Sequence, residues 1–103
     1  MGNSTNNSEL NIINNTQRQR FEFPVDDDFA YLEYRWYRKN LALMHTEVPR
    51  KVQGKGIAGL LAKFALDYAR KNDIKIMVYC PYVAAYLKRH PEYADLVDRN
   101  YQQ

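Results

Sequence analysis

The sequence predicts an α+β domain in which an antiparallel sheet is followed by a helix, a further strand and a second helix. Two observations predict this order. Apolar and polar residues alternate along three consecutive segments in the first half of the chain, which is typical of strands. In the second half the apolar spacing becomes that of an amphipathic helix and then returns to alternation. The chain has 103 residues, which is the length of one domain.

Three strands are expected in the first half. Residues 20–23 alternate before Pro24, and an acidic turn separates them from the aromatic-rich segment 29–37. Polar residues 38–40 then form the link of a hairpin to a third strand over residues 41–48.

Alternation along the third strand assigns its side chains to two faces. Leu41, Leu43, His45 and Glu47 are predicted to share one face, and the residues between them the other.

The second half begins with a predicted helix over residues 57–72, whose apolar residues recur every three or four positions. Residues 74–80 alternate again and predict a fourth strand. Pro81 suits the first turn of a second helix, and residues 91–97 predict one more helical piece.

The N-terminal segment is polar, with six asparagines among its first fifteen residues. Such a segment buries too little apolar surface to offset its ordering entropy. We therefore expect a flexible polar tail over residues 1–18 and a single domain over residues 19–103.

Composition excludes several classes. One cysteine and two histidines leave little material for a disulfide framework or a metal site, so no metal is expected. No apolar run approaches the length of a membrane span or resembles a signal peptide, so we expect a soluble, cytoplasmic protein. The net charge of +3 is too mild to predict nucleic-acid binding, but residues 50–103 carry +5, which suits a phosphorylated ligand or a weakly acidic surface.

The loop between the third strand and the first helix carries the clearest chemical signal. Gly54 and Gly56 permit turns that other residues avoid and let a ligand approach the backbone. Backbone N–H groups there would converge with the positive end of the helix dipole, and Lys55 would add charge. The alternative is a tight turn in which the glycines serve packing alone.

A strand followed by [Gln/Arg]-x-x-Gly-x-Gly/Ala at the start of an amphipathic helix resembles the acyl-CoA pyrophosphate loop of the GNAT superfamily of N-acetyltransferases. The loop here is Lys51–Gly56. Residues 45–49 (His-Thr-Glu-Val-Pro), 54–58, 80–83 and His90-Pro91 together resemble the small YjdJ-type acetyltransferase-like family. The resemblance covers about residues 20–97 and implies a minimal GNAT-like acyl-CoA N-acyltransferase fold of the three-layer α/β type.

The resemblance also implies a function, namely an N-acetyltransferase that binds acetyl-CoA or coenzyme A and acetylates an unidentified amine of a small molecule or a protein. A CoA-binding module without efficient transfer is the alternative, and a structural interaction domain is a third. No nucleic acid or membrane partner is expected, and the protein would be a monomer or a weak dimer. The expected CoA-binding residues are Val48, Gln53, Gly54, Lys55, Gly56, Ile57, Ala58 and Tyr82.

Three residues are candidates for catalysis. An imidazole suits a general base near neutral pH, so His45 is the first candidate for that role and Glu47 is the second. Cys80 would line the thioester pocket or, in a covalent mechanism, accept the acetyl group. The alternatives are a strand histidine in the core or at an edge, an exposed glutamate and a buried structural cysteine.

Overall fold

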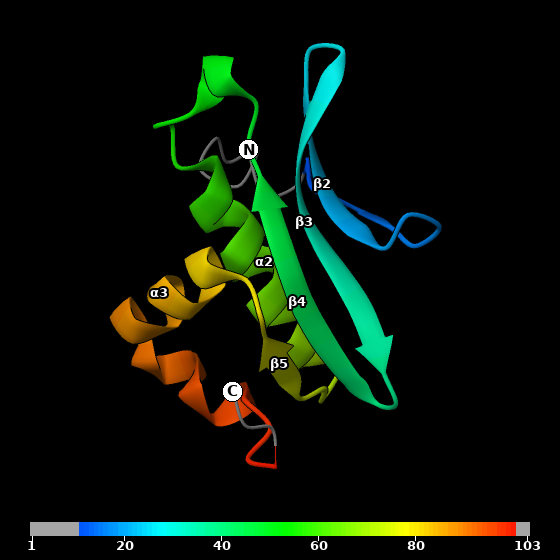
Figure 1. Ribbon diagram of the computed structural model, residues 1–103, viewed down its shortest axis with the longest axis vertical. Helices are drawn as coiled ribbons and strands as arrows, with labels where there is room; N and C mark the ends of the chain where they lie inside the picture. Colours follow the sequence, from blue (N-terminus) through cyan, green and yellow to red (C-terminus); the bar gives the residue numbers. More distant parts are fainter. Residues whose placement is uncertain (1–10, 101–103) are drawn as a thin grey trace, which may run out of the picture.

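The computed structural model describes residues 11–100, which form one five-stranded sheet with helices against it (Figure 1). The strands follow one another across the sheet in chain order. The first four are antiparallel neighbours, and the fifth is parallel to the fourth because a helix separates them in the chain. The strands are β1 (Ile13–Asn15), β2 (Arg20–Val25), β3 (Asp28–Tyr37), β4 (Asn40–Glu47) and β5 (Ile76–Val78).

The helical segments occupy the predicted places. A short 3-10 turn, η1, precedes the long helix, and a second one, η2, follows the last helix. The α+β class and the order of the predicted elements are confirmed, although β5 is shorter than the segment 74–80 expected for it. The helical segments are η1 (Arg50–Val52), α2 (Ile57–Lys71), α3 (Pro81–Arg89) and η2 (Pro91–Leu96).

One hydrophobic core lies between the sheet and the helices. Leu61 and Leu66 of α2 are fully buried in the same cluster as Phe21, Leu32 and Leu43 of the sheet. Burial of each such side chain contributes about 1.5–3 kcal/mol. The core therefore anchors α2 across β2, β3 and β4, and with it the loop that precedes the helix.

Helix α3 lies beside α2 and shares its core. A Cβ placed at Gly59 of α2 would lie 3.4 Å from the hydroxyl of Tyr82, and Val83 of α3 is fully buried. The helices of residues 11–100 thus cover one face of the sheet (Figure 1). The other face has no helix over it in this part of the chain, so the described residues form two layers rather than the expected three.

The C-terminal segment is held against α2 by polar contacts. Arg70 pairs with Asp95 at 2.6 Å, and the hydroxyl of Tyr93 donates to Asp67 at 2.6 Å. Burial, with the contribution of Asp67, raises the pKa of Tyr93 from 10.0 to about 12. Because the fold favours the neutral phenol, this contribution to stability is present below about pH 10 and is lost as the pH rises towards 12.

The sequence analysis missed β1, which lies inside the predicted tail. Ile12 is buried in the core, and β1 pairs with β2. Asn14 accepts a hydrogen bond from the Tyr34 hydroxyl at 2.6 Å, and Asn15 donates to the buried carboxylate of Glu22 at 3.2 Å. The expectation of a flexible tail is therefore wrong for residues 12–15, because strand pairing and two side-chain hydrogen bonds compensate for the low apolar content. Residues 1–10 lie outside the described part of the chain.

Deleting residues 1–17 should destabilise the domain. Loss of Ile12 from the core costs about 2 kcal/mol, and each lost hydrogen bond to Tyr34 or Glu22 costs about 1 kcal/mol more. Thermal unfolding measures the loss, with a truncation of residues 1–10 as the matched reference because it retains β1. Equal melting temperatures for the two truncated proteins would contradict the role assigned to β1.

Candidate active site

Strands β4 and β5 separate after a short stretch of parallel pairing. Their register ends at Leu43 and Val78, yet β4 continues to Glu47. The N–H groups of Tyr79 and Cys80 both donate to the carbonyl oxygen of Leu43, at 2.9 and 3.0 Å. The chain then turns away into α3, which leaves the β5-facing edge of β4 without a strand partner beyond Leu43.

A β-bulge lies at the same place, on the other side of β4. The pairing with β3 changes from Glu33 opposite His45 to Tyr34 opposite Leu43, so Met44 has no partner. A one-residue shift moves all following side chains to the opposite face. The predicted face assignment is therefore wrong beyond the bulge.

His45 and Glu47 lie on the open face of the sheet instead of sharing the buried face of Leu41 and Leu43. Their side chains are 54% and 57% exposed, and Nε2 of His45 lies 2.8 Å from Oε1 of Glu47. Their predicted sharing of one face is confirmed. The ring of Tyr31 also lies near His45, at 6.4 Å between centroids.

Thr46 takes the inward place. Its Oγ1 lies 3.2 Å from Sγ of Cys80, which is 2% exposed. This contact joins β4 to the residue that precedes α3, across the point where the two strands have separated. Nothing in the alternation of the sequence marks Thr46, because the bulge that turns it inward has no sequence signature.

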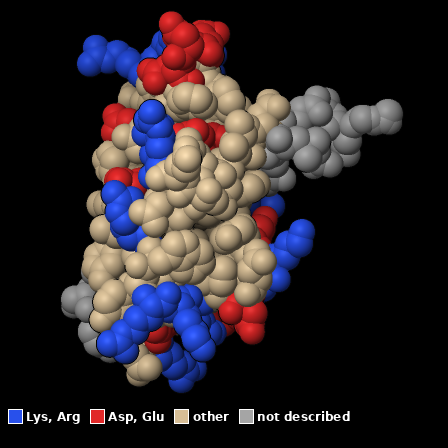
Figure 2. Space-filling view, turned by 90° about the vertical axis from the view of Figure 1, so that its right-hand side faces the viewer, with Lys and Arg blue, Asp and Glu red and all other residues tan. Residues whose placement is uncertain are grey.

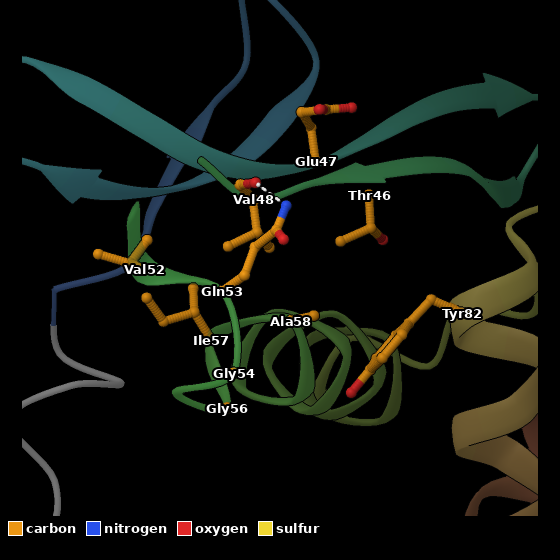
Figure 3. A pocket seen from close by; sticks show the side chains of 10 residues that line it. All are labelled: Thr46, Glu47, Val48, Val52, Gln53, Gly54, Gly56, Ile57, Ala58 and Tyr82. Carbon is orange, nitrogen blue, oxygen red and sulfur yellow. Dashed lines mark hydrogen bonds between the residues drawn. The ribbon is translucent and has the colours of Figure 1, made fainter. Parts of the chain in front are cut away.

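The end of β4, the loop before α2, the start of α2 and Tyr82 of α3 line a cleft of about 430 Å³ (Figure 3). Thr46 and Glu47 lie on its β4 side, and Tyr82 of α3 lies across from them. Seven of the predicted CoA-binding residues line the cleft, as does Glu47. These seven are Val48, Gln53, Gly54, Gly56, Ile57, Ala58 and Tyr82.

Three predicted residues do not line this cleft. Lys55 lines a neighbouring hollow that shares Val52 and Ile57 with it, and His45 and Cys80 line neither. Sequence reasoning missed Thr46 and Val52, which do line the cleft.

The loop ends in a helix N-terminus that no side chain caps. Gly56 is the N-cap residue of α2 and has a φ of 82°, and Gly54 has a φ of 83°. A Cβ at either glycine would meet no protein atom within 4 Å, so the loop backbone is open on that side. N–H groups at an uncapped helix start, next to left-handed glycines, are suited to bind an anion.

Gln53 and Lys51 differ in what they contact. The amide of Gln53 donates to the carbonyl oxygen of Val48 at 3.1 Å, inside the cleft (Figure 3). Lys51 instead pairs with Asp26 at 2.9 Å. The glycine-loop pattern therefore fits this structure better two residues later than Lys51–Gly56, with Gln53 at its first position.

The two tyrosines of α3 also differ. Tyr82 lines the cleft, whereas Tyr86 is buried and stacks on the ring of His90 at 4.1 Å between centroids. Burial raises the pKa of Tyr86. Tyr86 therefore serves packing.

Among residues 11–100, no group of three or more metal-ligating side chains lies close enough together to hold a metal ion. No helix within this range is long and apolar enough to cross a membrane.

Comparison with known proteins identifies relatives in animals and bacteria. Protein NATD1 of Mus musculus is 36% identical over 85 residues, which cover 80% of this chain and 77% of the relative. Protein NATD1 of Danio rerio is 32% identical over 95 residues, 87% of this chain and 86% of the relative.

A solved structure also resembles the chain. The solution structure of a GCN5-like protein from Staphylococcus aureus superposes with a TM-score of 0.68 at 26% identity, covering 88% of this chain and 90% of that one. The model of the GCN5-related N-acetyl-transferase family matches residues 20–96, from the start of β2 to the end of η2. The chain belongs to the GCN5-related N-acetyl-transferase family.

Proposed function

We propose that the chain binds acetyl-CoA in the cleft between the end of β4, the loop before α2 and Tyr82 of α3, and transfers its acetyl group to an amine. One observation carries the proposal: the unpaired edge of β4 and the uncapped N-terminus of α2 face the same cleft. The first suits an amide-containing chain, and the second suits a phosphate. The motifs at residues 45–49 and 80–83 support membership of the YjdJ-type group within the family.

The loop has the features that a pyrophosphate requires. Gly54 and Gly56 leave open space beside the backbone, and the first-turn N–H groups of α2 point out of the helix end. Arg50 and Lys55 are exposed in the same loop and add positive charge. Affinity for a diphosphate should therefore come mainly from backbone groups, with a salt-dependent contribution from the two cations.

Gln53 bears on how the pantetheine arm would bind. Its side-chain amide donates a hydrogen bond to the Val48 carbonyl oxygen, the acceptor that an amide N–H of the pantetheine arm would use. Binding then exchanges one amide N–H for another at that oxygen, and the Gln53 side chain turns towards the loop. The exchange conserves the hydrogen bond at Val48.

The chemistry is a transfer from sulfur to nitrogen. Acetyl-CoA supplies an activated thioester. The ammonium first gives one proton to a base, and the resulting neutral amine attacks the thioester carbon. An N–C bond forms and the C–S bond breaks. The departing thiolate takes the second proton from the nitrogen. The chain must therefore hold the arm, admit the amine and provide the base.

Glu47 is the base that the geometry favours. Glu47 is among the residues that line the cleft, and its carboxylate lies on the open face of the sheet (Figure 3), with Oε1 2.8 Å from Nε2 of His45. Glu47 would take the proton from the ammonium, and His45 would orient its carboxylate as a positioning residue. The sequence alone favoured His45 slightly.

A CoA-binding module without efficient transfer is the second candidate. Both His45 and Glu47 are more than half exposed, so water reaches the proposed base. A slow transfer rate with tight CoA binding would fit that candidate.

The substitution Gly56→Asn should remove CoA binding without unfolding the protein. Asparagine tolerates the left-handed backbone, so Gly56→Asn should retain the melting temperature but place a side chain in the ligand's path. Gly56→Val should lose both binding and stability. Isothermal titration with CoA measures the affinity, and wild-type affinity in Gly56→Asn would contradict the assignment of the loop.

Glu47→Gln should lower kcat/KM about 100- to 10,000-fold at neutral pH, because the ammonium loses its proton acceptor. The affinity for CoA should stay within about twofold, and activity should recover at high pH, where the amine is already neutral. Glu33→Gln is the matched control, since Glu33 lies opposite His45 but outside the cleft. Equal losses in the two variants would point to general electrostatics instead of a base.

Cys80→Ala should leave most of the activity, because we propose direct transfer. The thiol is buried against Thr46, so its loss costs packing at the base of the cleft. Mass spectrometry after incubation with acetyl-CoA alone should find no acetyl group on Cys80. An acetylated Cys80 that passes its acetyl group to an added amine at the turnover rate would contradict direct transfer.

A further inference from the structure

A largely apolar hollow of about 560 Å³, whose lining also includes Arg35 and Asn100, lies on the face of the sheet that no helix of residues 11–100 covers. Met44 and Tyr79 line it next to the cleft, Ala42 and Met77 form its floor, and Tyr37 lies at its far end. Tyr37, Met44 and Tyr79 are 55%, 36% and 45% exposed. We call the surface formed by these five hydrophobic residues the shelf.

The shelf is contiguous with the proposed site of transfer. Met44 directly precedes His45, and Tyr79 directly precedes Cys80. Along β4, Ala42 lies four residues from Thr46, or about 13 Å at 3.3 Å per residue. A ligand with its amine at the end of β4 would therefore place a group three or four extended residues away on the shelf.

Charge changes sign from one end of this surface to the other. The carboxylate of Glu47 lies beside His45 at one end, whereas Arg38 and Lys39 lie at the β3–β4 turn beyond Tyr37, in a hollow that Asp98 also lines. Figure 2 shows basic side chains gathered at the lower end of the view and, at the upper end, a group of acidic side chains with basic ones beside it. The guanidinium of Arg38 lies 5.6 Å from the Tyr37 ring centroid.

A complementary ligand has three parts in a fixed order. An amine would lie at Glu47, an apolar side chain on the shelf and carboxylates at Arg38 and Lys39. A small amine would leave the shelf and the basic turn unused. A polypeptide segment in extended form presents all three parts at the required spacing.

We propose that the acceptor is a peptide segment of a protein, with a lysine followed at about three residues by a bulky apolar residue and then by acidic residues. This inference rests on the proposed function, whose amine acceptor it specifies. The segment lies along the open face of β4, on the side of the sheet opposite to α2.

The probe is the peptide acetyl-Lys-Gly-Gly-Phe-Asp-Asp-amide. Its kcat/KM should exceed that of Nα-acetyl-lysine amide at least tenfold. Replacing Phe by Ser, or exchanging the two Asp for Lys, should each remove most of that advantage. Equal kcat/KM values for the peptide and for the lysine amide would overturn the proposal.

Variants of the protein test each end of the surface. Arg38→Glu should lower kcat/KM for the acidic peptide about 3- to 10-fold and raise it for the Lys-Lys peptide. Tyr79→Ser should weaken use of both phenylalanine peptides alike. Lys71→Glu, an exposed site at the end of α2, is the matched control and should change neither. An Arg38→Glu effect of the same sign on both peptides would overturn the charge assignment.

Two readouts separate this inference from the proposed function. Peptide binding is measured directly by fluorescence anisotropy, with and without CoA, and CoA affinity is measured by calorimetry in every variant. Peptide binding without any CoA binding would overturn the proposed function, but it would support the shelf as a peptide-binding surface. Concentration-dependent dimers in sedimentation that Tyr79→Ser abolishes would overturn the inference, because a second copy would then occupy the shelf.

Discussion

The architecture of the candidate site depends on the place where β4 loses its partner. Two consecutive N–H groups, those of Tyr79 and Cys80, converge on the carbonyl oxygen of Leu43. These two hydrogen bonds to one oxygen end the parallel ladder, because β5 offers no further donor in register with β4. Pro81 then starts α3 and directs the chain away. The cleft is the space that results, and the core contacts of α2 hold the glycine loop against its open end.

The bulge at Met44 makes the same segment serve two surfaces. Thr46 points inward to Cys80, while His45 and Glu47 meet on the open face. Glu47 is also among the residues that line the cleft, while its side chain points to the open face (Figure 3). An acyl donor held from the loop side and an amine arriving across the shelf would approach the same point of β4. The absence of a helix over that face of residues 11–100 leaves the second approach open.

Much of the fold could be predicted from the sequence because periodicity reports which face of an element is buried. The alternation in residues 29–37 and the helical spacing in residues 57–72 follow directly from burial against one core. The strand at Ile13–Asn15 escaped prediction because polar side chains support it: Asn14 and Asn15 satisfy groups on β3 and β2. Such pairing is specific to the partner strand and leaves no periodic signal.

The loop of the site was predictable, whereas the faces of β4 were not. The glycines at positions 54 and 56 predict a left-handed backbone, and both have a positive φ in the structure. The bulge follows from the register between β3 and β4, a tertiary property that no local pattern of residues 41–48 encodes. Extrapolated alternation therefore placed His45 on the face of Leu41 and Leu43 and overlooked Thr46. The cleft itself arises from residues 46–58 and from Tyr82, which lies more than twenty residues further along the chain, so only the folded chain shows it.

The central claim is that CoA binds where β4 has no partner and α2 has no cap. Titration of the ¹⁵N-labelled protein with CoA tests it most directly, since each backbone amide reports separately. The account predicts that the largest amide shift changes occur at residues 46–48, 53–59 and 82, with little change at residues 35–39 on the far end of the sheet. Shift changes centred on residues 35–39, or no response to CoA at millimolar concentration, would contradict it.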